Sequence, residues 1–297
     1  MTPPPKVHRV NRSPQSTSSE DHDAESKRRL SRVKEYCRNR KPGQQTKNLF
    51  VLEKYKIVYC PIHKAGSTTF THILLMLIGK ADPRRGFKGG VYHAGRDYIP
   101  KIKQFTPARR EEILRDYFKV MIVRDPLERL LSAYKDKMLD ISHRDVWIQR
   151  LLKDVYGKPI PKSRLPQVIR NSYRKPPPKK GESWSITFLQ FLEYILLLKP
   201  NIKAFDSHWR PYNVLCTPCD VNYDFIGETN TLSKDIPYIL EKIKVTRLPK
   251  SIPGRYAGNR TTHYFSDIPR DIINDLWNLY KEDYQICSFF KIFFSIF

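Results

Sequence analysis

Two short stretches of the sequence combine residue types and spacings that suit the binding of phosphate or sulfate. Residues 63–69 (HKAGSTT) bring together a lysine, a glycine and three hydroxyl side chains directly after an apolar run. When a strand, a tight loop and a helix follow one another, backbone N–H groups and a helix N-terminus point at one spot and attract an anion. Lys64 adds a mobile positive charge there, so we predict an anion-binding loop at 63–69.

The second stretch, residues 124–132 (RDPLERLLS), also follows an apolar run. Arg124 offers a planar guanidinium that can grip an anion, and Ser132 adds a hydroxyl from the helix that follows. Two such sites on neighbouring strand–helix units suit a nucleotide with phosphates at both its 5′ and its 3′ position. The alternative to anion binding is a purely structural role, in which Arg124 and Asp125 form a local ion pair and Ser132 is an ordinary helix residue.

The first loop admits two other interpretations. A Walker A motif, the phosphate loop of ATPases, places its lysine directly after a glycine, whereas Lys64 precedes Gly66. The sequence therefore disfavours a nucleotide kinase. An ordinary strand-to-helix turn with a solvated lysine remains open for the loop alone, and the second motif is what makes the anion site specific.

The elements that must position these residues form two similar units. Residues 56–60 (KIVYC) are apolar and β-branched, which predicts a buried strand. A helix follows, capped by Ser67 or Thr68 and ended by Gly79. The same order recurs with a second buried strand at 118–123 (FKVMIV) and the helix after it. Repeated strand–turn–helix units predict a three-layer α/β fold with a mainly parallel central sheet.

The remaining elements follow from periodicity and capping signals. Thr106 before Pro107 predicts the start of a helix that runs to residue 117. Other expected elements are helices at 186–198, 233–245 and 268–280, a strand at 221–227, and loops at 80–95 and 158–181. The second of these loops holds eight basic side chains and six prolines.

The N-terminal 47 residues differ from the rest in composition. They are rich in Pro, Ser, Gln and basic side chains, with no aromatic residue before Tyr36. Because they cannot bury enough apolar surface to offset chain entropy, we expect a disordered basic stem at 1–47 and one catalytic domain at 48–297. A charged helix at 23–37 would have little to pack against. With no signal peptide and no run of 18 apolar residues, the sequence as written predicts a soluble chain.

The chain is strongly basic. It contains 54 Lys and Arg against 30 Asp and Glu, a net charge of +24, of which +17 lies outside residues 1–47. Such a surface is typical of proteins with a polyanionic partner: nucleic acid, an anionic membrane or an acidic polysaccharide.

The five cysteines are too few for a disulfide scaffold, and their odd number leaves at least one unpaired. Cys60-x-x-His63 and Cys216-x-x-Cys219 have the spacing of zinc-ligand pairs. His63 lies inside the anion loop, so free thiols or disulfides are favoured over zinc.

Four ordered blocks of the sequence resemble the Golgi carbohydrate sulfotransferases of the chondroitin and dermatan 4-O-sulfotransferase type, a family that also includes a glucuronyl 3-O-sulfotransferase. The blocks are YCPIHKAGSTTF at 59–70, RDPLERLLSAYKDKM at 124–138, HWRPYNVLCTPCDVNYDFIGETNTL at 208–232 and YFSDIPRDIINDLWNLYKEDYQI at 264–286. The likeness covers about 56–287 and implies the three-layer, P-loop-like sulfotransferase fold. The sequence departs from the family at His63, Phe70 and Asn230, where proline, tryptophan and glutamate are usual.

The resemblance implies a site for 3′-phosphoadenylyl sulfate, the sulfate donor, and no metal. Its 5′-phosphosulfate would be wrapped by His63, Lys64, Ala65, Gly66, Ser67, Thr68 and Thr69. Its 3′-phosphate would be held by Arg124, Asp125, Pro126, Leu127, Glu128, Arg129, Leu130, Leu131 and Ser132. Lys64 would be catalytic, because a preorganised ammonium stabilises the charge that develops on the leaving nucleotide.

The acceptor hydroxyl needs a base. We expect His93, between the two motifs, to accept its proton, since imidazole titrates near neutral pH, and Glu228 is the reserve. A lone loop histidine is more often merely solvated. Arg260, Thr261 and Thr262 would close over the 3′-phosphate, an expectation in conflict with a glycosylation triplet at Asn259; a second triplet begins at Asn11.

These inferences predict a sulfotransferase that modifies an anionic glycan, most specifically the 4-hydroxyl of N-acetylgalactosamine in chondroitin or dermatan. The alternatives are a glucuronyl 3-O-sulfotransferase and a non-catalytic protein that binds heparin or another polyanion. The favoured function involves no nucleic acid. The resemblance places the enzyme on the lumenal side of the Golgi membrane, in an oxidising lumen where cysteines pair. An N-terminal membrane anchor, which this sequence does not show, would hold it there.

Overall fold

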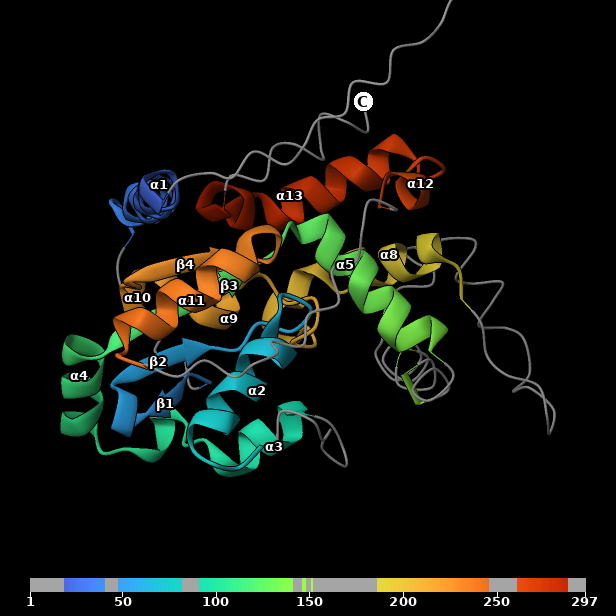
Figure 1. Cartoon of the computed structure of the whole chain (residues 1–297). Coiled ribbons are helices and arrows are strands. Elements are labelled where there is room, and N and C mark those ends of the chain that lie inside the picture. The colour runs from blue at the N-terminus through green and yellow to red at the C-terminus, as the bar shows by residue number, and fades with distance from the viewer. Residues whose placement is uncertain are drawn as a thin grey trace, which may run out of the picture.

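The centre of the protein is a four-stranded sheet with the strand order β1-β2-β3-β4 (Figure 1). The computed structural model describes residues 19–40, 48–81, 91–140, 146–147, 151, 186–245 and 261–287. The strands are β1 (Phe50–Leu52), β2 (Ile57–Cys60), β3 (Phe118–Val123) and β4 (Phe225–Glu228). β1 pairs antiparallel with β2, whereas β2, β3 and β4 run parallel. The predicted, mainly parallel sheet is confirmed.

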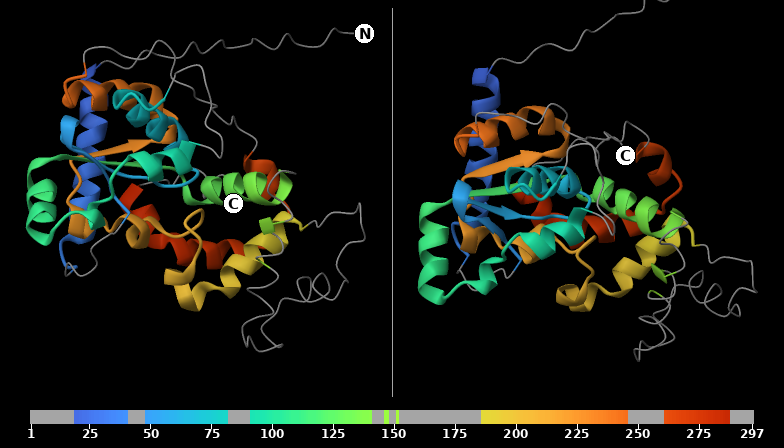
Figure 2. Two further views of the ribbon diagram at one scale, coloured as in Figure 1. Left: turned by 90° about the horizontal axis from the view of Figure 1, so that it is seen from below. Right: turned by 60° about the horizontal axis from the view of Figure 1, so that its bottom comes forward.

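Both faces of the sheet are covered by helices, because side chains alternate along the strands. On β2, Ile57 and Tyr59 join one buried apolar cluster, and Val58 joins the other. Figure 2 shows the sheet between helices on both sides, which confirms the three-layer prediction. The first side carries α2 (Ser67–Leu77), α3 (Val91–Tyr98) and α11 (Leu232–Lys242).

The second side is larger and holds most of the aromatic core. Its helices are α5 (Pro126–Tyr134), α8 (Phe188–Leu197), α9 (Tyr212–Cys216), α10 (Pro218–Val221) and α13 (Arg270–Cys287). The other named α-helices are α1 (Ser19–Cys37), α4 (Pro107–Asp116) and α12 (Thr261–Phe265). Short 3-10 turns span Glu53–Tyr55, Ile102–Gln104, Lys199–Ala204 and Thr229–Thr231, and a π-helical turn spans Lys135–Leu139.

Several helices begin where their capping residues predict. The Thr106 hydroxyl accepts a hydrogen bond from the Arg109 N–H at the start of α4, and Thr187 forms a capping box with Gln190 at the start of α8. The predictions for 106–117, 118–123 and 186–198 are confirmed within one or two residues, and the helix predicted at 233–245 is present as α11 but ends three residues early, at Lys242.

Three other boundaries also differ from the predictions. β4 begins at Phe225 because Pro218–Val221 forms α10, which stands between two residues in the left-handed conformation. α13 continues past the predicted end at 280 to Cys287. The predicted loop at 80–95 ends early, since α3 begins at Val91 and packs tightly on α2. A Cβ at Gly95 would lie 2.4 Å from the Thr71 methyl, which explains the glycine.

The N-terminal segment is the main correction. The sequence favoured disorder for residues 1–47, but Ser19–Cys37 form α1, which packs against α13, β4 and α10. Arg29, with a side chain only 3% exposed, donates to the Ile226 carbonyl at 3.2 Å and lies 3.3 Å from the Glu228 carboxylate. At least one charged residue of this helix therefore has its charged partners in the folded domain.

Two disulfides join distant parts of the chain. Cys37 of α1 is bonded to Cys219, and Cys60 at the end of β2 is bonded to Cys216. Cys287 is a buried free thiol. The zinc alternative is therefore wrong, because three of its four ligands are consumed in these bonds.

Some sequence expectations lie outside the described residues: the loop at 158–181, Asn11, Asn259, Arg260 and the apolar terminus at 288–297. Among the helices that the structure describes, none is both long enough and apolar enough to cross a membrane.

Candidate functional site

The lysine loop leaves the carboxyl end of β2 and makes a sharp turn into α2. Lys64 and Gly66 both have left-handed backbone angles, with φ of +66° and +75°. Gly66 is the residue before the helix, so the predicted cap at Ser67 or Thr68 is wrong by one or two residues. A Cβ at Gly66 would lie 3.1 Å from a methyl of Leu232. The left-handed conformation favours glycine here, and the nearby Leu232 methyl adds a tight contact for any larger residue.

The beginning of α2 is an open helix N-terminus. Gly66 supplies no side-chain cap, and the first helical hydrogen bond runs from the Phe70 N–H to the Gly66 carbonyl at 3.1 Å. The N–H groups of the first turn have no partner within an α-helix, and the helix dipole adds positive potential at this end. Residues 67–69 therefore offer a phosphate or sulfate a preformed cradle.

The Lys64 ammonium is paired with Asp136, which follows α5 in the chain. Its Nζ lies 3.3 Å from Asp136 Oδ2, and the side chains are 22% and 29% exposed. Burial lowers the pKa of Lys64, and the Asp136 carboxylate opposes that shift by favouring the charged form. Lys137 also contacts Asp136, at 2.9 Å. Asp136 was not predicted from the sequence, although it lies four residues after Ser132 on the same helical run.

The second motif comes from β3 and reaches the same place. Arg124 Nη1 lies 3.5 Å from the Lys64 carbonyl oxygen, and Arg124 Nε donates to Glu128 at 3.2 Å. Asp125 caps α5 by accepting from the Leu127 and Glu128 N–H groups at 2.9 and 3.0 Å. The structure thus brings the two predicted motifs together at the carboxyl ends of β2 and β3.

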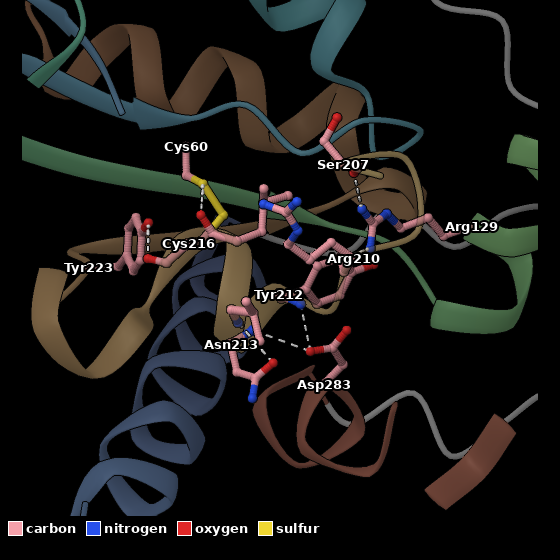
Figure 3. The surroundings of a disulfide bond; sticks show 11 residues. Cys60, Arg129, Ser207, Arg210, Tyr212, Asn213, Cys216, Tyr223 and Asp283 are labelled. Carbon is pink, nitrogen blue, oxygen red and sulfur yellow. Dashed lines mark hydrogen bonds between the residues drawn. A yellow bond between two sulfur atoms is a disulfide. The ribbon is translucent and has the colours of Figure 1, made fainter. Parts of the chain in front are cut away.

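Tyr212, at the start of α9, fixes the backbone of Arg124. Its buried hydroxyl accepts from the Arg124 N–H at 3.2 Å and donates to the Arg124 carbonyl. The Tyr212 N–H in turn donates to Asp283 of α13 at 2.7 Å (Figure 3). The second motif is therefore set by α9 and α13 as well as by its own strand.

Arg129 supports the lysine loop from behind. Its side chain is buried, and Nε donates to the His63 carbonyl at 2.9 Å. The other nitrogens donate to the carbonyls of Arg210 at 2.7 Å and Ser207 at 2.8 Å; Figure 3 shows the bond to Ser207. Three bonds to backbone carbonyls give Arg129 a positioning role. Of the other predicted residues in α5, Leu127, Leu130 and Leu131 are buried in the core, as is Pro126, and Ser132 is half-buried.

His63 turns its buried ring onto His208, with the ring centroids 4.3 Å apart. Burial lowers the pKa of His63 to about 3. His208 Nδ1 lies 2.5 Å from Asp206 Oδ1. This Asp–His pair was not predicted from the sequence. Its only sequence signal is the order Asp-Ser-His at 206–208, and an aspartate two residues before a histidine is common.

The two predicted bases have different positions. His93 lies in α3, and its side chain is outside what the structure describes, so its role stays a prediction. Glu228 ends β4 and is paired with Arg29 of α1. Burial raises the pKa of Glu228, and the Arg29 charge opposes this. A carboxylate held in a buried ion pair is poorly suited to move toward a substrate.

The departures from the family pattern fit the fold. Phe70 is fully buried and packs edge-on against Tyr59, with ring centroids 4.7 Å apart. Asn230 is exposed in the turn after β4. Neither changes the cradle or the two cations beside it.

Comparisons with known proteins agree with this geometry. The sequence profile described as "Sulfotransferase family" matches residues 47–289. Carbohydrate sulfotransferase 10 of Homo sapiens is 32% identical over 256 residues, covering 82% of this chain and 67% of that protein. The Danio rerio protein of the same name is 31% identical, covering 82% and 66%. Carbohydrate sulfotransferase 9 of Homo sapiens is 28% identical over 250 residues, covering 81% and 53%.

The chain spans about two thirds of the length of the carbohydrate sulfotransferase 10 relatives. No solved structure matches it. With the profile match covering most of the chain and a relative above 30% identity, the chain belongs to the sulfotransferase family, among relatives named as carbohydrate sulfotransferases.

Proposed function

We propose that this sulfotransferase transfers the sulfuryl group of 3′-phosphoadenylyl sulfate to a hydroxyl of an anionic glycan. The observation that carries the proposal is the meeting of the two motifs, with Arg124 Nη1 3.5 Å from the Lys64 carbonyl. One ligand with negative groups at both ends can then contact the lysine loop and the arginine together.

The residues present fit such a donor. The open N-terminus of α2, with the N–H groups of residues 66–68, would hold the 5′-phosphosulfate, since it offers donors and positive potential without a competing side-chain cap. Arg124 and Ser132 would hold the 3′-phosphate. Asp125 and Arg129 shape the backbone around these positions and need not touch the ligand. When bound, the donor supplies an activated sulfuryl group.

Lys64 would stabilise the transition state. Sulfuryl transfer places negative charge on the oxygen that leaves with the nucleotide, and a fixed ammonium lowers the energy of that charge. The contact with Asp136 keeps the ammonium protonated in a half-buried position and limits its motion. Keeping a charged ammonium half-buried lowers the stability of the fold, but it leaves the charge already in position when the reaction begins.

The acceptor that we propose is the 4-hydroxyl of N-acetylgalactosamine in chondroitin or dermatan. A glucuronyl 3-hydroxyl of a glycoprotein glycan is the alternative. Support comes from the resemblance of the four sequence blocks and from the net charge of +24, which attracts acidic polysaccharides. We propose the Golgi lumen as the location. A segment outside this sequence would hold the enzyme at the Golgi membrane. The two disulfides support an oxidising compartment.

The test is a labelled-sulfate transfer assay across chondroitin, desulfated dermatan and glucuronyl-terminated acceptors, followed by disaccharide analysis of the product. Immobilised adenosine 3′,5′-bisphosphate provides a second readout. Retention that survives salt but yields to free bisphosphate supports a nucleotide site. A protein that only binds polyanions would elute early with salt and transfer no sulfate.

A further inference from the structure

A series of side-chain contacts connects Lys64 to Trp147. Asp136 contacts both the Lys64 ammonium, at 3.3 Å, and the Lys137 ammonium, at 2.9 Å. Lys137 Nζ lies 5.3 Å from the ring centroid of Trp147. The indole ring therefore contacts a lysine that shares its carboxylate partner, Asp136, with Lys64.

The same chain of contacts returns to the lysine loop through a histidine. Trp147 packs edge-on against His208, with ring centroids 5.3 Å apart. His208 lies against His63, which directly precedes Lys64 in the loop. The contacts therefore close into a circuit that links His208 to Lys64 through His63 in one direction and through Trp147, Lys137 and Asp136 in the other. The side chain of His208 is 15% exposed.

Asp206 fixes the orientation and the tautomer of His208. Its Oδ1 lies 2.5 Å from His208 Nδ1 and also accepts the His208 backbone N–H at 3.0 Å. A carboxylate at Nδ1 keeps the ring proton on that nitrogen, so the lone pair is on Nε2. An imidazole oriented in this way by a carboxylate is the arrangement of a general base.

We infer that His208, positioned by Asp206, is the base that accepts the proton of the acceptor hydroxyl. This inference rests on the proposed function. The acceptor oxygen forms a bond to sulfur while the bond from sulfur to the nucleotide oxygen breaks. The hydroxyl proton passes to His208 Nε2. The electron pair of the broken bond leaves with the nucleotide oxygen, whose negative charge the Lys64 ammonium stabilises.

The neighbouring groups favour His208 over the other described candidates. His63 is more deeply buried, and its backbone carbonyl is tied to Arg129. Glu228 is paired with Arg29. Burial lowers the pKa of His208, and Asp206 opposes that shift, so the ring is neutral at neutral pH and able to accept a proton.

The test compares three single substitutions in the full chain. H208N retains an amide N–H that can donate to Asp206 but removes Nε2. H93Q removes the competing candidate, and H263N is the matched control at an exposed histidine of α12. We expect H208N to lower kcat by about 10² to 10⁴-fold, the range of a lost general base. Its affinity for adenosine 3′,5′-bisphosphate, measured by calorimetry, should stay within about twofold, and H263N should change neither quantity.

The pH profile separates a base from a structural histidine. Wild type should show an acid limb in kcat/KM that H208N lacks. D206N should move that limb to lower pH, because loss of the Asp206 charge lowers the pKa of His208 further. The other charged or titratable groups around His208 are His63, Lys137 and Asp136, and they are unchanged in both variants.

A readout independent of turnover uses ¹⁵N-labelled histidine. Acceptor oligosaccharide alone should shift the ring signal that H208N abolishes, and H208Q provides a second variant if H208N fails to fold. Near-normal turnover by a folded H208N or H208Q that still binds the bisphosphate would overturn the inference, and a collapse confined to H93Q would assign the base to His93. If wild type neither binds the bisphosphate nor transfers sulfate, the proposed function fails instead.

Discussion

The guanidinium of Arg124 lies 3.5 Å from the carbonyl oxygen of Lys64, although sixty residues separate the two in the chain. The parallel pairing of β2 with β3 creates this relationship, because both strands deliver their carboxyl ends to one edge of the sheet. Tyr212 then fixes the Arg124 backbone from a third segment. The site is thus assembled from parts that no local stretch of sequence contains.

Replacing Lys64 tests the role of the ammonium. K64A should lower kcat by about 10² to 10³-fold, because charge on the leaving oxygen is no longer stabilised. Affinity for adenosine 3′,5′-bisphosphate should fall far less. K54A, at an exposed lysine before β2, is the control and should behave like wild type. Equal loss of turnover in both variants would contradict this role.

Replacing Arg124 tests which end of the nucleotide it binds. R124A should weaken adenosine 3′,5′-bisphosphate by about 10 to 100-fold, as expected for a hydrogen-bonded charge pair. Adenosine 5′-phosphate lacks the 3′ group and should bind both proteins alike. Isothermal titration with the two nucleotides decides this. A similar loss for both nucleotides would show that Arg124 acts on the loop and not on the 3′-phosphate.

Removing the partner of Lys64 should alter the pH dependence. Burial already lowers the pKa of Lys64, and Asp136 opposes that shift, so D136N should lower this pKa further. The ammonium is required, so the alkaline limb of kcat should move to lower pH. D140N, at an exposed aspartate beyond the π-helical turn, is the control. An unchanged alkaline limb in D136N would contradict this prediction.

Arg129 should matter for stability. R129M keeps an unbranched apolar stem but leaves the carbonyls of His63, Ser207 and Arg210 without their donor. We expect a loss of about 3 to 5 kcal/mol in the free energy of unfolding, measured with urea. R96M, at an exposed arginine of α3, should change it by less than about 0.5 kcal/mol.

Asp283 predicts how stability depends on pH. Burial raises its pKa to about 7, despite the N–H groups of Tyr212 and Asn213 that favour the carboxylate. An unfolded aspartate titrates near about 3.9. Between these values the folded state binds more protons, so this contribution to stability is present below about pH 4 and is lost as the pH rises toward 7. Urea unfolding at pH 5 and pH 7.5 should show a smaller pH difference for D283N than for wild type.

Local signals predicted the parts of the fold that depend on local physics. The strands at 56–60 and 118–123, the cap at Thr106 and the two anion motifs follow from residue patterns over a few positions. The docking of α1 does not, because Arg29 finds its partners, Glu228 and Asp235, about 200 residues away. A charged helix without a visible partner resembles a solvated one.

The site was predicted in the same uneven way. Lys64 and Arg124 stand in motifs, so the sequence alone was enough to propose them as site residues. Asp136 and the pair of His208 with Asp206 depend on where a helix end and a loop arrive in space. Asp–x–His is too common a spacing to mark a site without the fold.

The disulfide between Cys60 and Cys216 joins the strand that enters the lysine loop to the short helix whose Tyr212 grips Arg124. One covalent bond therefore connects the elements that position Lys64 and Arg124. A newly made chain in which these cysteines are still reduced contains both anion motifs but lacks the covalent link between the elements that position them. If the proposed function holds, sulfate transfer should therefore increase when the bond between Cys60 and Cys216 forms.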